Sequence, residues 1–198
     1  MDQLTSLKNL VLAPYMLKAT VLIGVQRLTG GNQFRHSFAT LGILFDYKYF
    51  DDHVLLKAAL MHDILEDIDN QNADEIRFID LDGNDVVNVV LEVTRMKDET
   101  KIHYLERLQT ASTRAKILKC ADRIQNLTDL HLDTHTNQKI NDYLDQTEKY
   151  ILPLAKEVNP DFEKEITDLI IKRRKMCQNL SPVKGELPQG HDLGGGDI

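Results

Sequence analysis

Apolar residues recur at helical spacing along nearly the whole chain, and this pattern restricts the fold more than any other feature of the sequence. In DGNDVVNVVLEVT, Val86, Val89, Val90 and Val93 follow the i, i+3, i+4, i+7 spacing of one helical face. No segment alternates polar and apolar residues over a useful strand length. The sequence therefore predicts an all-α helical bundle, with helices at 4–28, 36–48, 53–67, 72–79, 83–95, 100–112, 114–131, 137–157 and 160–177.

Prolines and glycines mark the interruptions and the end of the predicted domain. Pro153 lies inside the 137–157 segment and predicts a kink or break there, because proline removes a backbone donor. Pro160 suits the first turn of the last helix. The final segment, SPVKGELPQGHDLGGGDI, is rich in glycine and proline and has few apolar residues. We therefore expect one domain over residues 1–178 and a flexible tail over 179–198.

Composition excludes several classes of protein. The 198-residue length and 42% hydrophobic content suit a globular domain with a sizeable core. A formal net charge of −7 argues against a broad nucleic-acid surface, but it allows a small phosphorylated ligand in a local basic pocket. The sequence shows neither a membrane-length apolar run nor a signal peptide, and its two cysteines form no disulfide framework. We expect a cytoplasmic protein that binds neither nucleic acid nor membrane, with homo-oligomerisation left open.

The segment AALMHDILEDID, residues 58–69, places four ionisable side chains within an otherwise apolar helix. His62, Asp63, Glu66 and Asp67 occupy positions i, i+1, i+4 and i+5, which share one helical face. No Lys or Arg falls on that face to pair the acids. Because buried polar groups need partners, the pattern predicts a bound cation with His62 and Asp63 as its first ligands.

One histidine and one aspartate are too few to hold a metal ion, so further ligands must come from other helices. His36 opens the helix of FRHSFATLGIL, and Asp122 interrupts the apolar pattern of AKILKCADRIQNLTDL, four residues before Asn126. Each of these residues alone has an ordinary structural explanation, such as a helix cap or a local charge pair. Their recurrence inside apolar helices favours a shared metal site.

These residues resemble a known family. A His, a His-Asp pair and a later Asp in a helical domain form the pattern of the HD superfamily of metal-dependent phosphohydrolases. AALMHDILEDID looks like the HDxxED signature of the RelA/SpoT-type alarmone hydrolases, AKILKCADRIQNLTDL is similar to their KLADRxxN helix, and QRLTGGNQFRH resembles their first His motif. The resemblance covers residues 20–178 and implies an HD-domain helical bundle that acts as a small stand-alone hydrolase.

The resemblance also implies roles for these residues. Four side chains are implied as ligands of one Mn²⁺ ion: His36, His62, Asp63 and Asp122. Geometry alone would also permit iron or zinc. Glu66 and Asp67 are implied as the acidic pair that orients and activates the attacking water. The implied reaction is hydrolysis of the 3′-pyrophosphate of (p)ppGpp, giving GDP or GTP and pyrophosphate.

Contacts with the nucleotide are implied for Arg27 and Asn126. The remaining phosphates need cations, and among those of TRMKDETKIHYLERLQTASTRAKILK our candidates are Arg114 and Lys116, just ahead of the KCADR helix. The family usually has Arg-Lys-Ser-Gly-Glu-Pro-Tyr before its first His, and here Leu28 replaces the lysine. The base is therefore left open between guanine and adenine, and NADPH is a further candidate substrate.

Two other functions stay open at this point. A broader HD-superfamily phosphohydrolase, acting on NADPH, a nucleotide or a dNTP, usually has a different acidic pair after its His-Asp motif. A non-catalytic nucleotide-sensing module would have lost a ligand or the acidic pair, and this sequence keeps all of them. His131 and His135 have the i, i+4 spacing of a zinc pair, but no third strong ligand follows, so we expect them at the surface.

Overall fold

A computed structural model describes residues 3–179 of the chain and confirms the all-α prediction. Within this range the one β-type pairing is an isolated bridge between Gln26 and Asn32. None of the described helices is both long enough and apolar enough to cross a membrane. The flexible tail predicted over 179–198 lies, beyond Asn179, outside the described residues.

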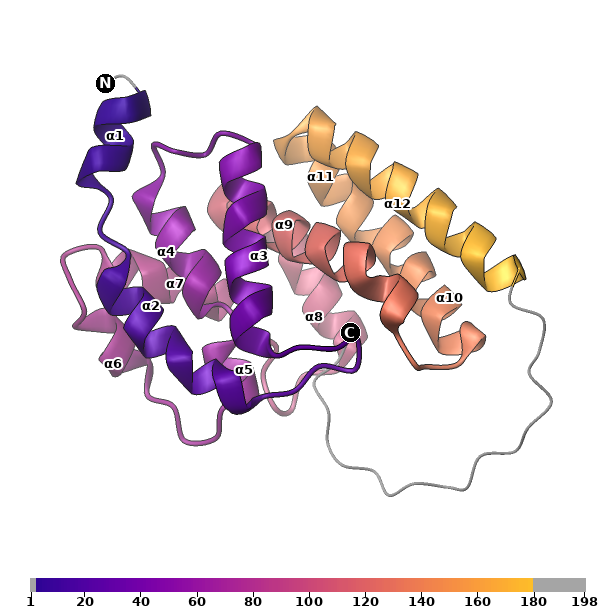
Figure 1. Cartoon of the computed structure of the whole chain (residues 1–198), viewed down its shortest axis with the longest axis horizontal. Coiled ribbons are helices and arrows are strands. Elements are labelled where there is room, and N and C mark those ends of the chain that lie inside the picture. Colours follow the sequence, from indigo (N-terminus) through magenta and orange to yellow (C-terminus); the bar gives the residue numbers. More distant parts are fainter. Residues whose placement is uncertain (1–2, 180–198) are drawn as a thin grey trace.

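The helices follow one another closely along the chain (Figure 1). The first half forms, in order, α1 (Gln3–Asn9), α2 (Ala13–Ala19), the 3₁₀ helix η1 (Thr20–Gly24), α3 (Gln33–Asp46), α4 (His53–Met61), α5 (Ile64–Asp67), α6 (Ala73–Arg77) and α7 (Gly83–Val93). The second half forms α8 (Lys101–Arg107), η2 (Leu108–Thr110), α9 (Thr113–Asp129), η3 (Leu130–Leu132), α10 (Asn137–Gln146), the π-helix η4 (Thr147–Ile151), α11 (Leu152–Val158) and α12 (Pro160–Asn179).

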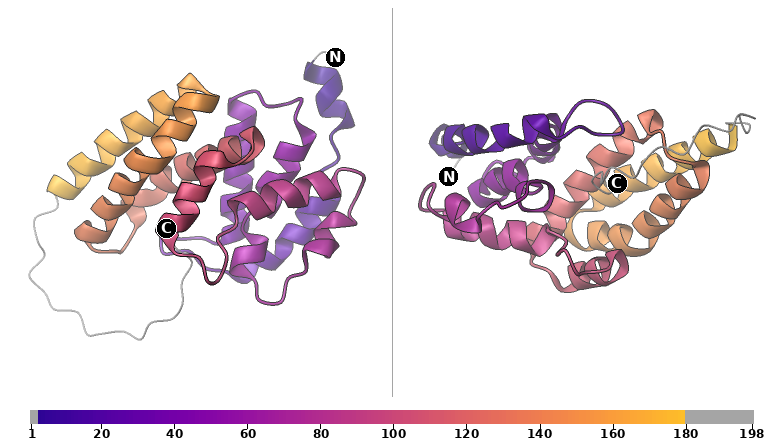
Figure 2. Two further views of the ribbon diagram at one scale, coloured as in Figure 1. Left: turned by 180° about the vertical axis from the view of Figure 1, so that it is seen from behind. Right: turned by 90° about the horizontal axis from the view of Figure 1, so that it is seen from below.

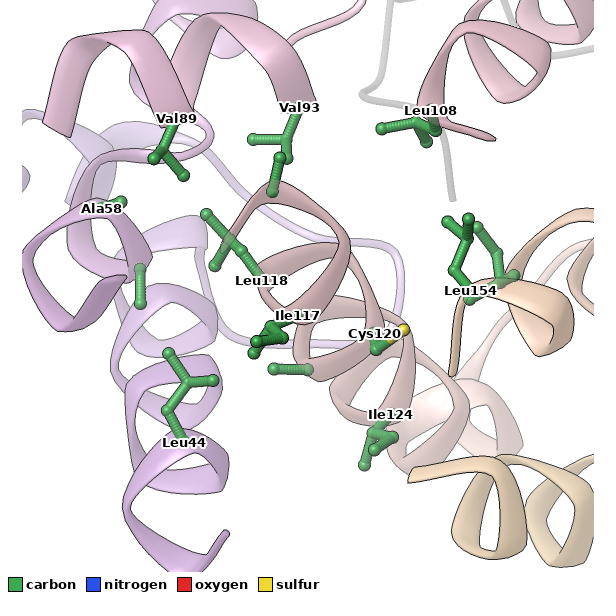
Figure 3. Packing of buried hydrophobic residues seen from close by; sticks show 14 of the residues in the cluster. Leu44, Ala58, Val89, Val93, Leu108, Ile117, Leu118, Cys120, Ile124 and Leu154 are labelled. Carbon is green, nitrogen blue, oxygen red and sulfur yellow. The ribbon is translucent and has the colours of Figure 1, made fainter. Parts of the chain in front are cut away.

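Helix α9 lies at the centre of the bundle and packs against α3, α4, α7, α11 and α12 (Figures 1 and 2). Figure 3 shows its buried Leu118 and Ile124 among side chains from the surrounding helices, including Val93 of α7 and Leu154 of α11. Each such side chain contributes about 1.5–3 kcal/mol when it is fully buried. The central helix therefore places the polar residues of its other face in a rigid, closely packed setting.

Capping residues fix where the helices of the core begin. The Asn32 side chain accepts the backbone N–H of Arg35 at the start of α3, and the Asp52 side chain accepts that of Leu55 at the start of α4. Ser112 caps α9 in the same way. A cap of this kind contributes about 1 kcal/mol because it satisfies a backbone donor that has no partner within the helix.

The structure divides two helices that the sequence predicts as continuous. The 4–28 segment becomes α1, α2 and η1, and α2 begins anew with Pro14 in its first turn. The 53–67 segment breaks at His62 and Asp63, which join α4 to α5. Both junction residues keep helix-like backbone angles, so the predicted polar face survives the break.

The interruption predicted at Pro153 is confirmed. The chain passes from α10 through the π-helical turn η4 into α11, which has this proline in its first turn. A π-helical turn absorbs an extra residue without ending the rod. The turn also contains Thr147, whose buried hydroxyl accepts a 2.8 Å hydrogen bond from Arg123 of the central helix.

Candidate active site

The four side chains predicted as metal ligands converge on one buried point. His36 comes from α3, His62 and Asp63 from the α4–α5 junction, and Asp122 from α9. Nε2 of His36 lies 3.2 Å from Nε2 of His62, 3.1 Å from Oδ1 of Asp122 and 3.4 Å from Oδ2 of Asp63. Nε2 of His62 lies 3.1 Å from the same Asp63 oxygen. Residues separated by 86 positions in the sequence thus share a single cluster.

Both imidazole rings are oriented by carbonyl groups behind them. Nδ1 of His62 donates to the backbone carbonyl of Ala59 at 2.9 Å. Nδ1 of His36 donates to the side-chain oxygen of Gln125, whose amide nitrogen in turn donates to Asp129 at 2.5 Å. Because Nδ1 of each ring donates to an oxygen behind it, Nε2 is the nitrogen of each ring that faces the cluster and could bind a metal.

The donor set of the cluster fits a divalent cation. Two ring nitrogens and two carboxylate oxygens meet, and the two ring nitrogens are the close polar neighbours of the buried Oδ2 of Asp63. Burial lowers the pKa of His62, but the charges of Asp63 and Asp122 outweigh it and raise this pKa to about 9. Imidazole nitrogens and carboxylate oxygens suit Mn²⁺, Fe²⁺ or Zn²⁺, and one ion would satisfy all four groups.

Two neighbours on α9 hold Asp122 in place. The Lys119 ammonium donates to Oδ2 at 2.7 Å, and the Asn126 amide donates to Oδ1 at 2.7 Å. The nearby Lys119 charge outweighs burial and holds the pKa of Asp122 well below its usual range. The carboxylate therefore stays ionised in an interior that would otherwise protonate it.

Glu66 and Asp67 line the same cavity as the cluster, one helical turn beyond the His-Asp pair. Oε2 of Glu66 accepts the backbone N–H of Arg95 at 3.1 Å, and Oδ2 of Asp67 accepts the side-chain amide of Gln33 at 2.6 Å. Burial raises the pKa of Glu66, while burial and the neighbouring Asp63 charge raise that of Asp67 to about 7. Carboxylates with raised pKa values in a cavity are typical of general acid–base chemistry.

The cavity combines these acids with positive charge. Five cationic side chains line it: Arg27, Arg95, Lys101, Lys119 and Arg123. Tyr104 and Tyr143 line it as well, and the hydroxyl of Tyr143 is buried without a hydrogen-bond partner. A cavity with this balance of charge can hold a highly phosphorylated small molecule, although the chain as a whole is acidic.

The structure brings together both side chains expected to contact a nucleotide. Arg27 lies in the loop between η1 and α3, where Gly30 and Gly31 adopt positive φ angles of 89° and 75°. Its Nη2 donates to Oδ1 of Asn126 at 2.6 Å, across a separation of 99 residues. Glycine is the residue that adopts such angles without strain, so the two glycines allow the loop to turn back over the cavity.

The expectation for Arg114 and Lys116 is corrected by their positions. Arg114 pairs with the capping carboxylate of Asp52 at 2.8 Å, and Lys116 pairs with Glu157 of α11 at 2.7 Å. Neither residue lines the cavity. The cavity-facing positions of α9 begin one turn later, at Lys119.

The structure also includes cavity residues that the sequence analysis did not single out. Lys119 was one of several cations in a charged region, and its i, i+3 relation to Asp122 was the one local signal available. Gln33 and Tyr143 of the cavity carried no such signal, and neither did Gln125, which lies behind His36. Their roles follow from contacts between helices that are distant in the sequence.

His131 and His135 do not meet at a second metal site. His131 is exposed and its Nδ1 donates to the backbone carbonyl of Thr128, while His135 pairs with Asp133 at 2.7 Å. Over residues 3–179, the group of three or more close metal-binding side chains that the structure contains is His36, His62 and Asp122. The surface position predicted for His131 is confirmed.

A helical bundle in which a His, a His-Asp pair and an Asp from separate helices converge beside a cation-lined cavity defines the HD class of metal-binding domains. The HD domain family matches residues 13–157. Guanosine-3′,5′-bis(diphosphate) 3′-pyrophosphohydrolase MESH1 of Drosophila melanogaster is 33% identical over 128 residues, which are 62% of this chain and 70% of the relative. The Mus musculus protein of the same name is 30% identical over 152 residues, or 73% and 82% of the two chains.

A solved structure agrees with these relatives. The structure of a metazoan SpoT orthologue that hydrolyses ppGpp superposes with a TM-score of 0.72 at 26% identity, covering 82% of this chain and 94% of the other. The chain belongs to the HD domain family and, within it, to the family of the MESH1 pyrophosphohydrolases.

Proposed function

We propose that this protein is a divalent-metal-dependent pyrophosphohydrolase that converts guanosine 3′,5′-bis(diphosphate) and water into GDP and pyrophosphate. The observation that carries the proposal is that three residues of the metal-type cluster, the two acids of α5 and the five cations line one cavity. The MESH1 relatives bear this activity in their names, and the chain covers 70% and 82% of their lengths.

The proposed metal is one Mn²⁺ ion, held by His36, His62, Asp63 and Asp122. When bound, such an ion supplies an acidified water molecule and neutralises charge on the phosphoryl oxygens. The buried Asp63 oxygen close to both ring nitrogens and the orientation of the two imidazoles support this assignment. The same donors accommodate iron or zinc, so the assay below compares the three metals.

The chain's own acids would position and deprotonate the nucleophile. Glu66 and Asp67 orient a water molecule and accept its proton as its oxygen forms a bond to the phosphorus next to the 3′-oxygen. The bond between that phosphorus and the 3′-oxygen breaks, and the 3′-oxygen leaves as a hydroxyl after taking up a proton. Placement of both carboxylates beside the cluster supports these roles.

The cations would hold the phosphates while this displacement occurs. Lys119 and Arg123 lie on α9 beside Asp122, and Lys101 lies at the start of α8 near the ring of Tyr143. Tyr143 also lines the cavity, and its buried hydroxyl has no hydrogen-bond partner within the described residues. Arg27 and Asn126 line the same cavity and bond to each other, and we assign this pair to the nucleoside.

The assay that tests the proposal incubates the purified chain with ppGpp, ppApp, NADPH or dGTP in the presence of Mn²⁺, Fe²⁺ or Zn²⁺. Release of pyrophosphate from ppGpp is expected, with kcat reduced by about 100-fold or more in Glu66→Gln and in Asp67→Asn. Asp69→Asn is the matched control, because this carboxylate follows in the same segment but is 88% exposed and pairs with Lys97.

The outcomes separate the competing functions. Pyrophosphate from ppApp but not from ppGpp would keep the reaction and reassign the base. Inorganic phosphate from NADPH, or triphosphate from dGTP, with no turnover of either alarmone would replace the proposal with a broader HD phosphohydrolase. Tight binding of ppGpp without turnover under any of the three metals would indicate a sensing module.

A further inference from the structure

A continuous chain of hydrogen bonds runs along the lining of the cavity from the proposed water-activating acid to the metal-type cluster. Asp67 accepts from the Gln33 amide at 2.6 Å, and the Gln33 oxygen accepts from Nη1 of Arg27 at 2.6 Å. Nη2 of Arg27 donates to Asn126 at 2.6 Å, and Asn126 donates to Asp122 at 2.7 Å. Side chains from α5, α3, the loop before α3, and α9 thus form one network.

Gln33 is the link in this network that both donates and accepts between two charged groups. A guanidinium only donates and an ionised carboxylate only accepts, so the orientation of the Gln33 amide is fixed by its two partners. Its backbone position is fixed as well, because Gln33 is the first residue of α3, directly after the capping residue Asn32. The side chain is half-buried at the cavity wall and has little freedom to point elsewhere.

We propose that Gln33 is a positioning residue that holds the Asp67 carboxylate and the Arg27 guanidinium at a fixed spacing along the cavity lining, so that the water-activating acid and the nucleotide-binding arginine stay in place relative to each other. The inference rests on the proposed function, because it assigns Asp67 to the water and Arg27 to the nucleotide. Its physical basis is that misplacing a reacting group by about 1 Å can reduce the rate about 100-fold.

The two ends of the Gln33 amide have separable consequences. Loss of the amide N–H releases Asp67 and is expected to lower kcat, because the water is then held less well. Loss of the amide oxygen releases Arg27 and is expected to weaken nucleotide binding. A hydrogen bond to a charged group is worth roughly tenfold to a hundredfold in an equilibrium constant, so each effect is large enough to measure.

Gln33→Met removes both hydrogen bonds while keeping the length of the side chain. With ppGpp and Mn²⁺, kcat is expected to fall about tenfold and KM to rise about tenfold. In an Asp67→Asn background the substitution should cause no further loss of kcat, and in an Arg27→Met background no further rise in KM. Gln138→Met, at an exposed glutamine of α10, is the matched control and should change neither constant.

Gln33→Glu separates the two halves of the role. The new carboxylate still accepts from Arg27, but it places a second negative charge beside Asp67. We expect GDP affinity, measured by calorimetry, to stay within about twofold of the wild type. We expect kcat to fall at least as far as in Gln33→Met. If Gln33 served only to stabilise the fold, Gln33→Glu would lower the melting temperature and would reduce kcat and GDP affinity together.

The calorimetric measurement of GDP binding keeps this inference distinguishable from the proposed function. If the wild type releases no pyrophosphate from ppGpp, the proposed function fails, and GDP affinity still decides the contact of Gln33 with Arg27. A tenfold loss of GDP affinity in Gln33→Met that Gln33→Glu does not share supports that contact. Unchanged affinity in Gln33→Met, or losses of kcat that simply add to those of Asp67→Asn, would overturn the positioning role.

Discussion

Replacing Lys57 by methionine tests a buried charge network that joins three parts of the fold. Lys57 belongs to α4, is 4% exposed, and lies 2.6 Å from carboxylate oxygens of both Asp80 and Asp82, just before α7. Asp80 also accepts the hydroxyl of Tyr15 from α2 at 2.6 Å. Methionine keeps the apolar stem of the lysine in contact with its neighbours and removes the charge.

The expected loss of stability follows from how far each partner is exposed. Removing one member of a fully buried ion pair costs about 3–5 kcal/mol, whereas an exposed pair contributes about 0–1 kcal/mol. The Asp82 side chain is 39% exposed and returns to water at little cost, while that of Asp80 is 27% exposed and keeps two other donors. We therefore expect a loss of about 2 kcal/mol, which lies between the two limits.

Thermal and urea unfolding measure this loss directly. For a domain of this size, about 2 kcal/mol corresponds to a fall in melting temperature of about 4–8 °C. The matched control is Lys97→Met, because the Lys97 side chain is 88% exposed and its pair with Asp69 spans 3.5 Å; its effect should stay within about 0.5 kcal/mol. If Lys57→Met changed stability no more than this control does, the reasoning from burial would be refuted.

Three further predictions concern the metal, the core and the corrected cations. Mn²⁺ at about 100 times its Kd should stabilise the wild type by about 2.7 kcal/mol in thermal unfolding, and Asp63→Asn should lose most of this effect; an equal shift in both would contradict the ligand assignment. Phe162→Ala should cost about 3–5 kcal/mol in urea unfolding, because the ring is fully buried 4.2 Å from that of Tyr47, and a loss below about 1 kcal/mol would contradict its place in the core. Lys116→Met should leave KM for ppGpp within about twofold of the wild type, because its ammonium pairs with Glu157 outside the cavity; a tenfold rise would return it to the site.

The helical fold could be predicted because its evidence is local. The spacing of Val86, Val89, Val90 and Val93 identifies the buried face of α7, and all four are buried. The break at His62 and Asp63 could not be predicted in this way, because the apolar pattern continues across it. At the break, the His62 imidazole donates to the carbonyl of Ala59 on the preceding turn, a contact that the apolar spacing does not indicate.

The acidic part of the site could be predicted for a related reason. Burying a carboxylate or an imidazole among apolar residues costs free energy unless it has a partner, so the sequence itself indicates that a partner is needed. Cations give no comparable signal, because a long Lys or Arg side chain on any helix can reach water. Lys119 reaches into the interior and Lys116 reaches to α11, yet both lie in the same run of charged residues.

Neutral amides are the least predictable part of the site, and they explain why its geometry depends on the whole bundle. Gln125 orients His36, and Gln33 connects Asp67 to Arg27; each amide needs a donor and an acceptor from different elements. A glutamine is also common at exposed helical positions, so the sequence around Gln125 and Gln33 does not indicate their roles. The ligand residues can therefore be predicted from the sequences of single helices. Their spacing depends on amides whose partners come together only when α3, α5 and α9 pack. Substitutions at such amides should change catalytic constants more than stability, whereas substitutions in the core should do the reverse.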